Sequence, residues 1–416
     1  MDFIPSNLQV LTASAERILL LQGPNGSFFR QFGQWLEQQG KRVYKINFNY
    51  GDEFFYPLSI ANTFAYRGTL EADENSGQPG FSVFLADFVA KYKIQAIVCF
   101  GDTRPYHQKA RRLAKMRNGL SFWAFEEGYF RPYFITLEQY GVNDFSCLPR
   151  EAGFFLTALP HLAEQEYLNP PSVPGGFFPM AKRAVCYYLA ANVGRRFYPH
   201  YIHHRHLDIW HYIKSWTLSG LKRIVYWLAD RNFSRRIQKG EFGRFFVVPL
   251  QVFNDSQVRV HSDFSSVRNF LIHVMTSFAF HAPKDTRLLI KHHPMDRGFI
   301  DYQKVIRHFV KRHPSCTGRI HYVHDVPLPV FLRYGIGMVT LNSTSGISAL
   351  LHKMPVITLG RANYHISGLT YQGSLADFWK KPDPPDAELF HAFRQYHINV
   401  TQINGSYYSR VNLPPL

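Results

Sequence analysis

The stretch from Arg287 to Gly360 decides the fold. It reads RLLIKHHPMD at 287–296, GMVTLNSTSGISALL at 337–351 and HKMPVITLG at 352–360. Each part holds a short apolar run bounded by polar or turn-forming residues, which is typical of a strand buried on both faces of a sheet. Between the first two runs, 301–312 has the pattern of an amphipathic helix. Strands that alternate with helices in this way predict a parallel α/β sheet.

Polar residues follow these strands, at the edge where an open parallel sheet binds its ligands. The first strand is followed by Lys291, His292, His293 and Pro294, and the second by Asn342, Ser343, Thr344, Ser345 and Gly346. The second cluster also opens an expected helix over 347–352. Backbone N–H groups at a helix start, together with short hydroxyls, suit an anionic phosphate. The two clusters predict a nucleotide-phosphate site, and Gln251, after the expected strand 245–250, belongs to the same edge.

His293 is the candidate acid of this site. Pro294 restrains His293 to an extended conformation at the strand end. A histidine there can hydrogen-bond a phosphate or protonate it as it leaves near neutral pH, and Lys291 adds positive charge. The structural alternative is that His-Pro is a common dipeptide and that a serine- and threonine-rich turn only caps a helix.

The first half of the chain opens with a strand, a glycine turn and a helix. RILLLQ at 17–22 leads into Gly23, Pro24, Asn25 and Gly26, and an amphipathic helix is expected over 27–39. This order begins a doubly wound domain, and the turn is either an anion or sugar site or simply a tight connection. Further strands are expected at 41–48, 95–100 and 121–125, whereas 49–52 and 136–150 are expected to be loops.

Two adjacent carboxylates end the strand at 121–125. Glu126 and Glu127 precede Gly128, and Arg131 and Pro132 follow shortly after. Successive side chains of a strand point to opposite faces, so one of the two glutamates is expected to face a cleft. A nearby arginine keeps a carboxylate ionised, as a nucleophile or base requires. A structural Glu–Arg pair explains the same residues equally well.

The segment 169–240 differs from the rest of the chain. After the Pro- and Gly-rich stretch 169–176, residues 181–240 contain twelve lysines and arginines against two acids, with many tyrosines and tryptophans between them. A basic, aromatic, helical segment favours contact with anionic lipid headgroups. Packing against the core and nucleic-acid binding are the alternatives. Its histidines carry no accompanying cysteine or carboxylate set, so we expect no metal site.

Composition sets the outer limits. The chain has 416 residues, 46% of them hydrophobic, and a formal net charge of +17, which calls for an anionic partner. Four scattered cysteines fit a reduced, cytosolic protein. The N-terminal sequence is not expected to be a signal peptide, and no apolar run is long enough to span a membrane. We expect an N-terminal Rossmann-like domain at 1–168, a helical insertion at 169–240, a second Rossmann-like domain at 241–380, and a closing segment at 381–416 that packs on the first domain.

Taken together, these motifs resemble the KpsS-type (LipB-like) capsular polysaccharide proteins. The resemblance covers about Arg17 to Trp379 and rests on four motifs: LLQGPNG at 20–26, FEEGY at 125–129 with Arg131-Pro132, KHHP at 291–294, and NSTSG at 342–346. It implies a GT-B arrangement, two Rossmann-like domains with the active site in the cleft between them. Related Kdo transferases carry Glu-Asp-Gly where this chain has Glu126-Glu127-Gly128, a departure of one methylene that shifts the carboxylate.

The resemblance implies a retaining β-Kdo transferase. The donor is CMP-Kdo, the acceptor is phosphatidylglycerol or its lyso form, and the product starts the poly-Kdo linker of a capsular polysaccharide. The implied roles are nucleophile or base for Glu127, with Glu126 as the alternative; acid for His293; CMP contacts for Lys291, Pro294, Ser343–Gly346 and Gln251; and donor or acceptor contacts for Gly23, Asn25 and Arg131. Neither a metal nor another cofactor is expected, and nucleic acid is not an expected partner.

The implied location is the cytoplasmic side of the inner membrane of a Gram-negative bacterium. A KpsC-type transferase and the capsule export machinery are the partners that the resemblance suggests. Two other functions stay open: a non-catalytic membrane adaptor for polysaccharide export, and a transferase of the same fold that uses another CMP-sugar such as CMP-sialic acid.

Overall fold

The computed structural model describes residues 3–72, 79–162, 171–174, 176–203 and 209–414. Residues 169, 170, 175 and 204–208 of the predicted basic segment lie outside these ranges. The chain divides into two compact units. Unit 1 comprises Met1–Cys147, Ala158–Ile209 and Arg394–Leu416, and unit 2 comprises Leu148–Thr157 and Trp210–Phe393. The predicted insertion is thus divided between the units, and the end of the chain belongs to unit 1.

Unit 1 is built on a seven-stranded sheet in the order β12-β6-β5-β4-β1-β2-β3. The strands are β1 (Arg17–Leu20), β2 (Arg42–Asn47), β3 (Thr63–Ala65), β4 (Ala96–Phe100), β5 (Ser121–Glu127), β6 (Phe134–Gln139) and β12 (Gln402–Asn404). The first five run parallel, and β6 and β12 add two antiparallel pairings. The order of the parallel strands is that of a Rossmann half, 3-2-1-4-5.

Helices cover both faces of this sheet because neighbouring side chains of each strand point to opposite sides. Ile18 and Leu20 of β1 pack in one core with α1 (Asn7–Ser14) and α2 (Phe28–Gln38). Leu19 and Leu21 pack in the other core with α4 (Phe81–Tyr92) and α5 (Pro105–Met116). The unit is completed by α3 (Tyr50–Phe55), α7 (Phe177–Val193) and the 3-10 turns Asn143–Phe145, Leu159–His161 and Arg195–Phe197.

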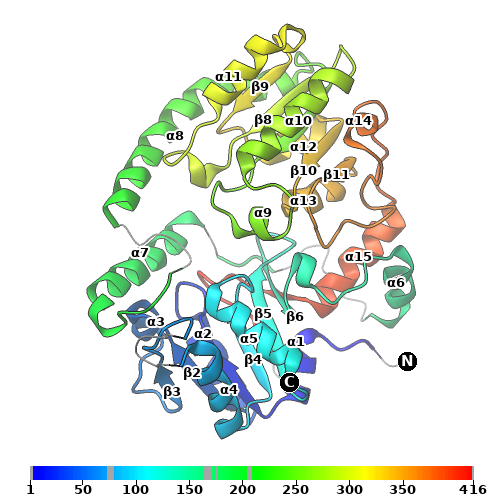
Figure 1. The fold of residues 1–416 in the computed structure, drawn as a ribbon. Helices are drawn as coiled ribbons and strands as arrows, with labels where there is room; N and C mark the ends of the chain where they lie inside the picture. The colour runs from blue at the N-terminus through cyan, green and yellow to red at the C-terminus, as the bar shows by residue number, and fades with distance from the viewer. Residues whose placement is uncertain (1–2, 73–78, 163–170, 175, 204–208, 415–416) are drawn as a thin grey trace. The chain divides into compact units, whose positions relative to one another are not determined.

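Unit 2 contains a five-stranded, fully parallel sheet in the order β11-β10-β7-β8-β9. The strands are β7 (Phe245–Pro249), β8 (Arg287–Lys291), β9 (Ile320–Val323), β10 (Gly337–Thr340) and β11 (Val356–Thr358). Counted from β7, this is again the order 3-2-1-4-5. Figure 1 shows each unit as a sheet flanked by helices, with unit 2 coloured from green to orange. The predicted α/β class with two Rossmann-like units, the class of GT-B proteins, is confirmed.

The helices of unit 2 fall before, between and after its strands. They are α6 (Ala152–Ala158), α8 (Ile209–Gln238), α9 (Ser256–Val260), α10 (Val267–His281), α11 (Gln303–Arg312), α12 (Leu328–Tyr334), α13 (Ser345–Leu351), α14 (Leu375–Phe378) and two 3-10 turns, Pro294–Asp296 and Pro314–Cys316. The last helix, α15 (Ala387–Val400), runs from unit 2 into unit 1. Within the described ranges, no helix is long and apolar enough to cross a bilayer.

Two segments that the sequence predicts to be loops contain regular structure, so these two predictions are wrong. Residues 136–139, the start of the expected loop-rich return, belong to strand β6, which pairs with β5 on one side and β12 on the other. The strand was obscured by Glu138, which is buried and accepts a 2.5 Å hydrogen bond from the Tyr129 hydroxyl. The expected loop at 49–52 begins α3, because the Asn49 side chain caps it by accepting from the Asp52 N–H at 3.0 Å.

Candidate functional site

In unit 2, the polar residues lie at the point where the strand order reverses. The adjacent strands β7 and β10 are the first and fourth of the sheet, so helices leave them toward opposite faces, and ligands of doubly wound sheets bind at this point. Gln251 follows β7, Asn342 follows β10, and the Gln251 Nε2 donates to the Asn342 Oδ1 at 3.0 Å. Both residues are buried. Within the described residues, the buried Gln251 Oε1 has no hydrogen-bond donor. Leaving such an acceptor unpaired costs about 1–3 kcal/mol, so a ligand N–H or O–H here would recover that loss.

The turn after β10 is held in one conformation. The Ser345 N–H donates to the Ser343 Oγ at 3.2 Å, and the Tyr364 hydroxyl donates to the Ser343 carbonyl at 2.5 Å. A Cβ at Gly346 would lie 2.2 Å from the Tyr364 hydroxyl oxygen, so only glycine lets the tyrosine approach. Thr344 is the N-cap of α13, yet its side chain makes no capping hydrogen bond. The simple helix-cap alternative therefore does not account for the Thr344 hydroxyl.

The two histidines after β8 have different environments. His292 is buried, and its Nδ1 lies 2.6 Å from the Tyr322 hydroxyl. Burial, and then the charge of His324, lowers the pKa of His292 to about 3, so it is neutral at pH 7. His293 is half-buried, and its Nδ1 accepts from the Met295 N–H at 3.2 Å in the turn that Pro294 begins. The turn thus uses the His293 Nδ1 as an acceptor of a backbone N–H.

Lys291 contributes positive charge beside these histidines. Burial, and then repulsion by Arg297, lowers the pKa of Lys291 to about 8. The ammonium group is therefore still mostly protonated at pH 7. β8 is the neighbour of β7, which Gln251 follows. Lys291 ends β8, and His293 comes shortly after it. The predicted residues of unit 2 thus share one edge of its sheet.

In unit 1, the glycine turn lies at the corresponding reversal, between β1 and β4. Arg104, which follows β4, donates from Nη1 to the Gly23 carbonyl at 3.3 Å and joins the two strand ends. Gly26 has φ +145°, and a Cβ there would lie 2.9 Å from the Arg183 Cδ. Asn25 is half-buried in the same turn. Gly26 is thus favoured by its positive φ and by the close approach of Arg183.

The predicted carboxylates end β5. The Glu126 Oε1 accepts from the Glu127 N–H at 3.0 Å, and the Tyr408 hydroxyl donates to the Glu127 Oε1 at 3.3 Å. The Tyr407 hydroxyl donates to the Glu126 carbonyl at 2.7 Å. Burial, and then the negative charge of Glu127, raises the pKa of both tyrosines, so they stay protonated as donors. Arg131 is exposed, and its Nε donates to the Gly128 carbonyl at 3.3 Å.

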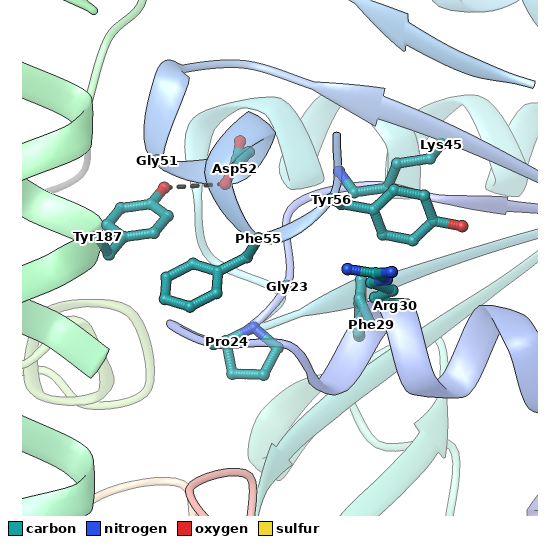
Figure 2. Close-up of a pocket in the computed structure, with 11 residues that line it drawn as sticks. Gly23, Pro24, Phe29, Arg30, Lys45, Gly51, Asp52, Phe55, Tyr56 and Tyr187 are labelled. Atoms are coloured by element: carbon teal, nitrogen blue, oxygen red, sulfur yellow. Dashed lines mark hydrogen bonds between the residues drawn. The ribbon is translucent and has the colours of Figure 1, made fainter. Parts of the chain in front are cut away.

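A buried polar cluster beside the glycine turn was not expected from the sequence. The Asp52 carboxylate accepts from the Tyr187 hydroxyl at 2.9 Å, the Gln22 Nε2 at 3.2 Å and the Phe48 N–H at 3.0 Å. Figure 2 shows Tyr187 hydrogen-bonded to Asp52 next to Gly23 and Pro24. Asn49 and Asp52, spaced as a helix cap, were a signal for α3, but no local pattern indicated that Tyr187 of α7 would reach them.

Nearby, Lys45 is fully buried, and its Nζ donates to the Ile46 carbonyl at 2.6 Å. Burial lowers the pKa of Lys45 to about 8, although the charge of Asp52 raises it in part. A cavity of about 20 Å³ lies between these groups and the glycine turn, with Gly23, Pro24, Gly26 and Arg30 in its lining. This volume is that of about one water molecule, so the cavity itself holds no sugar.

In the part of the chain that the structure describes, no group of three or more His, Cys, Asp or Glu residues could hold a metal ion. His204 and His206 of the histidine-rich segment lie outside the described residues.

The structure is thus a two-unit α/β protein with polar residues at one edge of each sheet. The model of the family described as capsule polysaccharide biosynthesis protein matches residues 95–408, and the chain belongs to that family. Capsule polysaccharide modification protein LipB of Neisseria meningitidis is 58% identical over 411 residues, 99% of this chain and 96% of that protein. Capsule polysaccharide export protein KpsS of Escherichia coli is 39% identical over 406 residues, 97% and 99% of the two chains.

The resemblance to KpsS-type and LipB-type proteins is therefore confirmed over nearly the whole chain. Among solved structures, KpsC of Thermosulfurimonas dismutans, described as a beta Kdo 2,7 transferase, aligns with 89% of this chain and 88% of that chain. The identity is 13% and the TM-score 0.42.

Proposed function

We propose that this capsule protein is a glycosyltransferase that moves β-Kdo from CMP-Kdo to phosphatidylglycerol or its lyso form, starting a poly-Kdo linker. The observation that carries the proposal is the polar edge at the strand reversal of unit 2. There a buried, unpaired acceptor on Gln251 lies beside a fixed Ser/Thr turn. Lys291 ends the neighbouring strand, and His293 follows it. A nucleotide with a donor group on its base and an anionic phosphate matches that set.

In this proposal, the residues of unit 2 hold CMP. The hydroxyl groups of Ser343, Thr344 and Ser345 donate hydrogen bonds to the phosphate. Gly346 has no side chain, so Tyr364 can pack against their turn. Lys291 adds charge, Pro294 fixes the direction of His293, and the His293 Nε2 protonates the leaving phosphate. These groups stabilise the negative charge on CMP without a metal ion.

The residues of unit 1 act on the sugar and the acceptor. Glu127 serves as nucleophile or base in a retaining transfer. The Glu126 carboxylate holds the backbone in place by accepting the N–H of Glu127. Gly23, Asn25 and Arg131 contact the donor carboxylate or the acceptor. A KpsC-type transferase would extend the product before export.

His293→Asn tests the acid. An asparagine oxygen can still accept the Met295 N–H, as the His293 Nδ1 does, so the turn is kept while the proton donor is lost. We expect transfer to slow by about a hundredfold or more, with an unchanged midpoint of thermal unfolding. His293→Ala, which removes both functions, should lower stability as well. Full activity of His293→Asn would exclude His293 as the acid.

We further propose that α8 rests on the anionic surface of the inner membrane. Its face toward the rest of unit 2 is polar: Ser215 and Ser219 are buried, Tyr226 stacks on His324 with ring centroids 3.8 Å apart, and Asp230 accepts the His324 N–H at 2.7 Å. The opposite face is apolar and exposed, with Leu218, Leu221, Ile224, Val225 and Leu228 between 39% and 62% accessible. This spacing makes one continuous stripe.

The charge of α8 selects the partner. Residues 214–238 contain Lys214, Lys222, Arg223, Arg231, Arg235 and Arg236, with Asp230 as their one acid. A second copy of this helix would bring like charges together, whereas anionic headgroups would meet cations and their acyl region would meet the stripe.

Replacing Leu221, Ile224, Val225 and Leu228 by serine tests this surface. Full burial of a large apolar side chain contributes about 1.5–3 kcal/mol to the free energy of binding. The variant should therefore bind phosphatidylglycerol vesicles at least about tenfold more weakly. Co-sedimentation measures this. The control replaces Phe280 and Leu351, which are also exposed in unit 2, by serine. Equal binding of the α8 variant and the control would contradict the proposed surface.

The deciding experiment for the function is a transfer assay. Purified protein is incubated with CMP-Kdo generated in place and a short-chain fluorescent phosphatidylglycerol, and mass spectrometry follows the addition of one Kdo. CMP-sialic acid is run in parallel. A Kdo product supports the proposal, and a sialic acid product replaces the donor. No product together with intact vesicle binding favours a non-catalytic adaptor, for which the α8 surface is the supporting observation.

A further inference from the structure

A groove runs along unit 1 between α3 and the first turns of α7. Its volume is about 590 Å³, and it is lined by Phe55 of α3 and by Phe178, Pro179, Lys182, Arg183 and Cys186 of α7. Sites for small ligands have volumes of about 300–1,000 Å³. Four of the six lining residues are apolar or weakly polar, and neither carboxylate nor amide side chains take part. The groove therefore suits a slender apolar ligand rather than a sugar.

Aromatic side chains around the groove are open to solvent. Phe178 is 81% exposed, Phe177 is 46% exposed, and Phe54 of α3 is 56% exposed. Farther along α7, Val185, Leu189 and Val193 continue an outward apolar stripe, while Tyr187 and Ala191 face the unit. Gathered apolar side chains of this kind mark a contact with a partner or a membrane.

Charge identifies the partner of the groove. Residues 176–203 contain Lys182, Arg183, Arg195 and Arg196 and no acidic residue. Lys182 is exposed, whereas the Arg183 guanidinium is fixed by donating from Nη1 to the carbonyls of Pro179 and Tyr408. An apolar channel with two cations along one wall matches a ligand with an acyl chain and an anionic head. A second copy of α7 would meet the same cations, which repel it.

The groove also connects with the glycine turn. Phe55 lines both the groove and the small cavity beside Gly23 and Pro24. Figure 2 shows the Phe55 ring beside Pro24. Arg183, at the groove wall, would contact any side chain at Gly26, since its Cδ lies 2.9 Å from the Cβ position there. A ligand head held by Arg183 is therefore adjacent to the turn proposed to meet the acceptor.

We propose that the α3–α7 groove binds one acyl chain of an anionic phospholipid and holds the lipid phosphate at Lys182 and Arg183. The inference rests on the proposed function, because it assigns that lipid as the acceptor and places its phosphate next to Gly26. Because the groove holds a single acyl chain, a lysolipid suffices for binding.

Cys186 reports on this site without any added label. It lines the groove and is partly buried, whereas Cys147 is exposed in the same chain and serves as an internal reference. We would measure the rates at which a maleimide modifies both thiols, by peptide mass spectrometry of the full-length protein. The probe is lysophosphatidylglycerol below its micellar concentration, and lysophosphatidylcholine of equal chain length is the control lipid. We expect lysophosphatidylglycerol to slow the modification of Cys186 at least fivefold and to leave the modification rate of Cys147 unchanged.

Variants make the test specific. Phe178→Ser and Lys182→Glu should lose the protection, and both side chains are exposed, so the fold should be kept. Val193→Ser, on the same stripe but outside the groove lining, should retain it. Unprotected Cys186, equal protection by lysophosphatidylcholine, or protection that instead grows with protein concentration would each overturn the proposal. Transfer activity without protection would refute the groove alone, and protection without transfer from CMP-Kdo would refute the transferase alone.

Discussion

The Glu127→Gln variant is expected to lose transfer of Kdo by about a thousandfold or more and to keep its CMP-dependent stabilisation. A glutamine has nearly the same shape as glutamate, and its carbonyl oxygen can still accept from the Tyr408 hydroxyl, which now lies 3.3 Å from the Glu127 Oε1. The fold at the end of β5 should therefore be preserved. An amide, however, is neither a nucleophile nor a base, so only the chemical step should fail. Single-turnover transfer, followed by mass spectrometry, measures the loss.

Glu126→Gln is the matched control. The Glu126 Oε1 accepts the backbone N–H of Glu127, and a glutamine oxygen can do the same. We therefore expect a loss of about tenfold or less, since the backbone that carries Glu127 stays in place. If Glu126→Gln is inactive and Glu127→Gln is active, the roles of the two residues are exchanged. If both variants turn over at the normal rate, the pair is structural.

A further variant tests the contribution of the Tyr408 hydroxyl separately from that of the Glu127 carboxylate. Tyr408→Phe removes the hydrogen bond to Glu127 but leaves its charge. If Tyr408 positions Glu127, this variant should lose part of the single-turnover activity, because the hydrogen bond that orients the carboxylate is gone.

Of the twelve strands that the structure describes, the sequence predicted β1, β2, β4, β5, β7, β8, β10 and β11, because buried strands produce a local signal. Runs such as those at 245–250 and 338–341 are apolar on both faces, and each is followed by polar residues, so both the strand and its polar end could be predicted. The KHHP motif did not by itself show which histidine is buried. That difference depends on Tyr322, which comes from the neighbouring strand β9 and contacts His292.

Contacts between distant parts of the chain could not be predicted. Tyr407 and Tyr408 each lie 281 residues from the glutamate whose backbone or side chain they contact, and no periodic pattern connects them. They reach β5 because β12 pairs with β6, a pairing of two strands that the sequence did not indicate. The same holds for Tyr187, whose place in a basic helix gave no sign of its hydrogen bond to Asp52.

Helix α8 shows a different limit. Its composition predicted a basic aromatic helix, but composition does not say which face is buried. The structure buries Ser215 and Ser219 and exposes Leu221 and Val225, the reverse of an ordinary surface helix. Periodicity alone would have placed the apolar stripe against the sheet.

The motif Glu126-Glu127-Gly128 has a steric requirement that is separate from its chemistry. A Cβ at Gly128 would lie 2.0 Å from the Phe134 carbonyl oxygen and 2.5 Å from its carbonyl carbon. Both are backbone atoms at the start of β6, which is held by pairing with β5 on one side and β12 on the other. Since the backbone cannot move aside as a flexible side chain would, only glycine fits. The glycine of the motif thus allows the close packing of β5 and β6 that positions Glu127.

Gly128→Ala should therefore be more damaging to the fold than any other single methyl group at this edge. We expect the free energy of unfolding to fall by about 3 kcal/mol or more, since overpacking against paired backbone forces β5 and β6 apart. Chemical denaturation followed by circular dichroism measures this. Activity should fall as well, because the Thr136 hydroxyl, which donates to the Glu127 carbonyl at 3.1 Å, would move with β6.

Gly220→Ala is the control for Gly128→Ala. A Cβ at Gly220, within helix α8, meets nothing within 4 Å, so alanine there should leave stability unchanged or raise it by about 0.5–1 kcal/mol through helix propensity. A Gly128→Ala protein as stable as the Gly220→Ala protein would show that β6 can yield. In that case the glycine would have to be explained by the chemistry of Glu127 and not by the fold. A stable but inactive Gly128→Ala protein would lead to the same conclusion, because it would separate the position of the carboxylate from the packing of the strands.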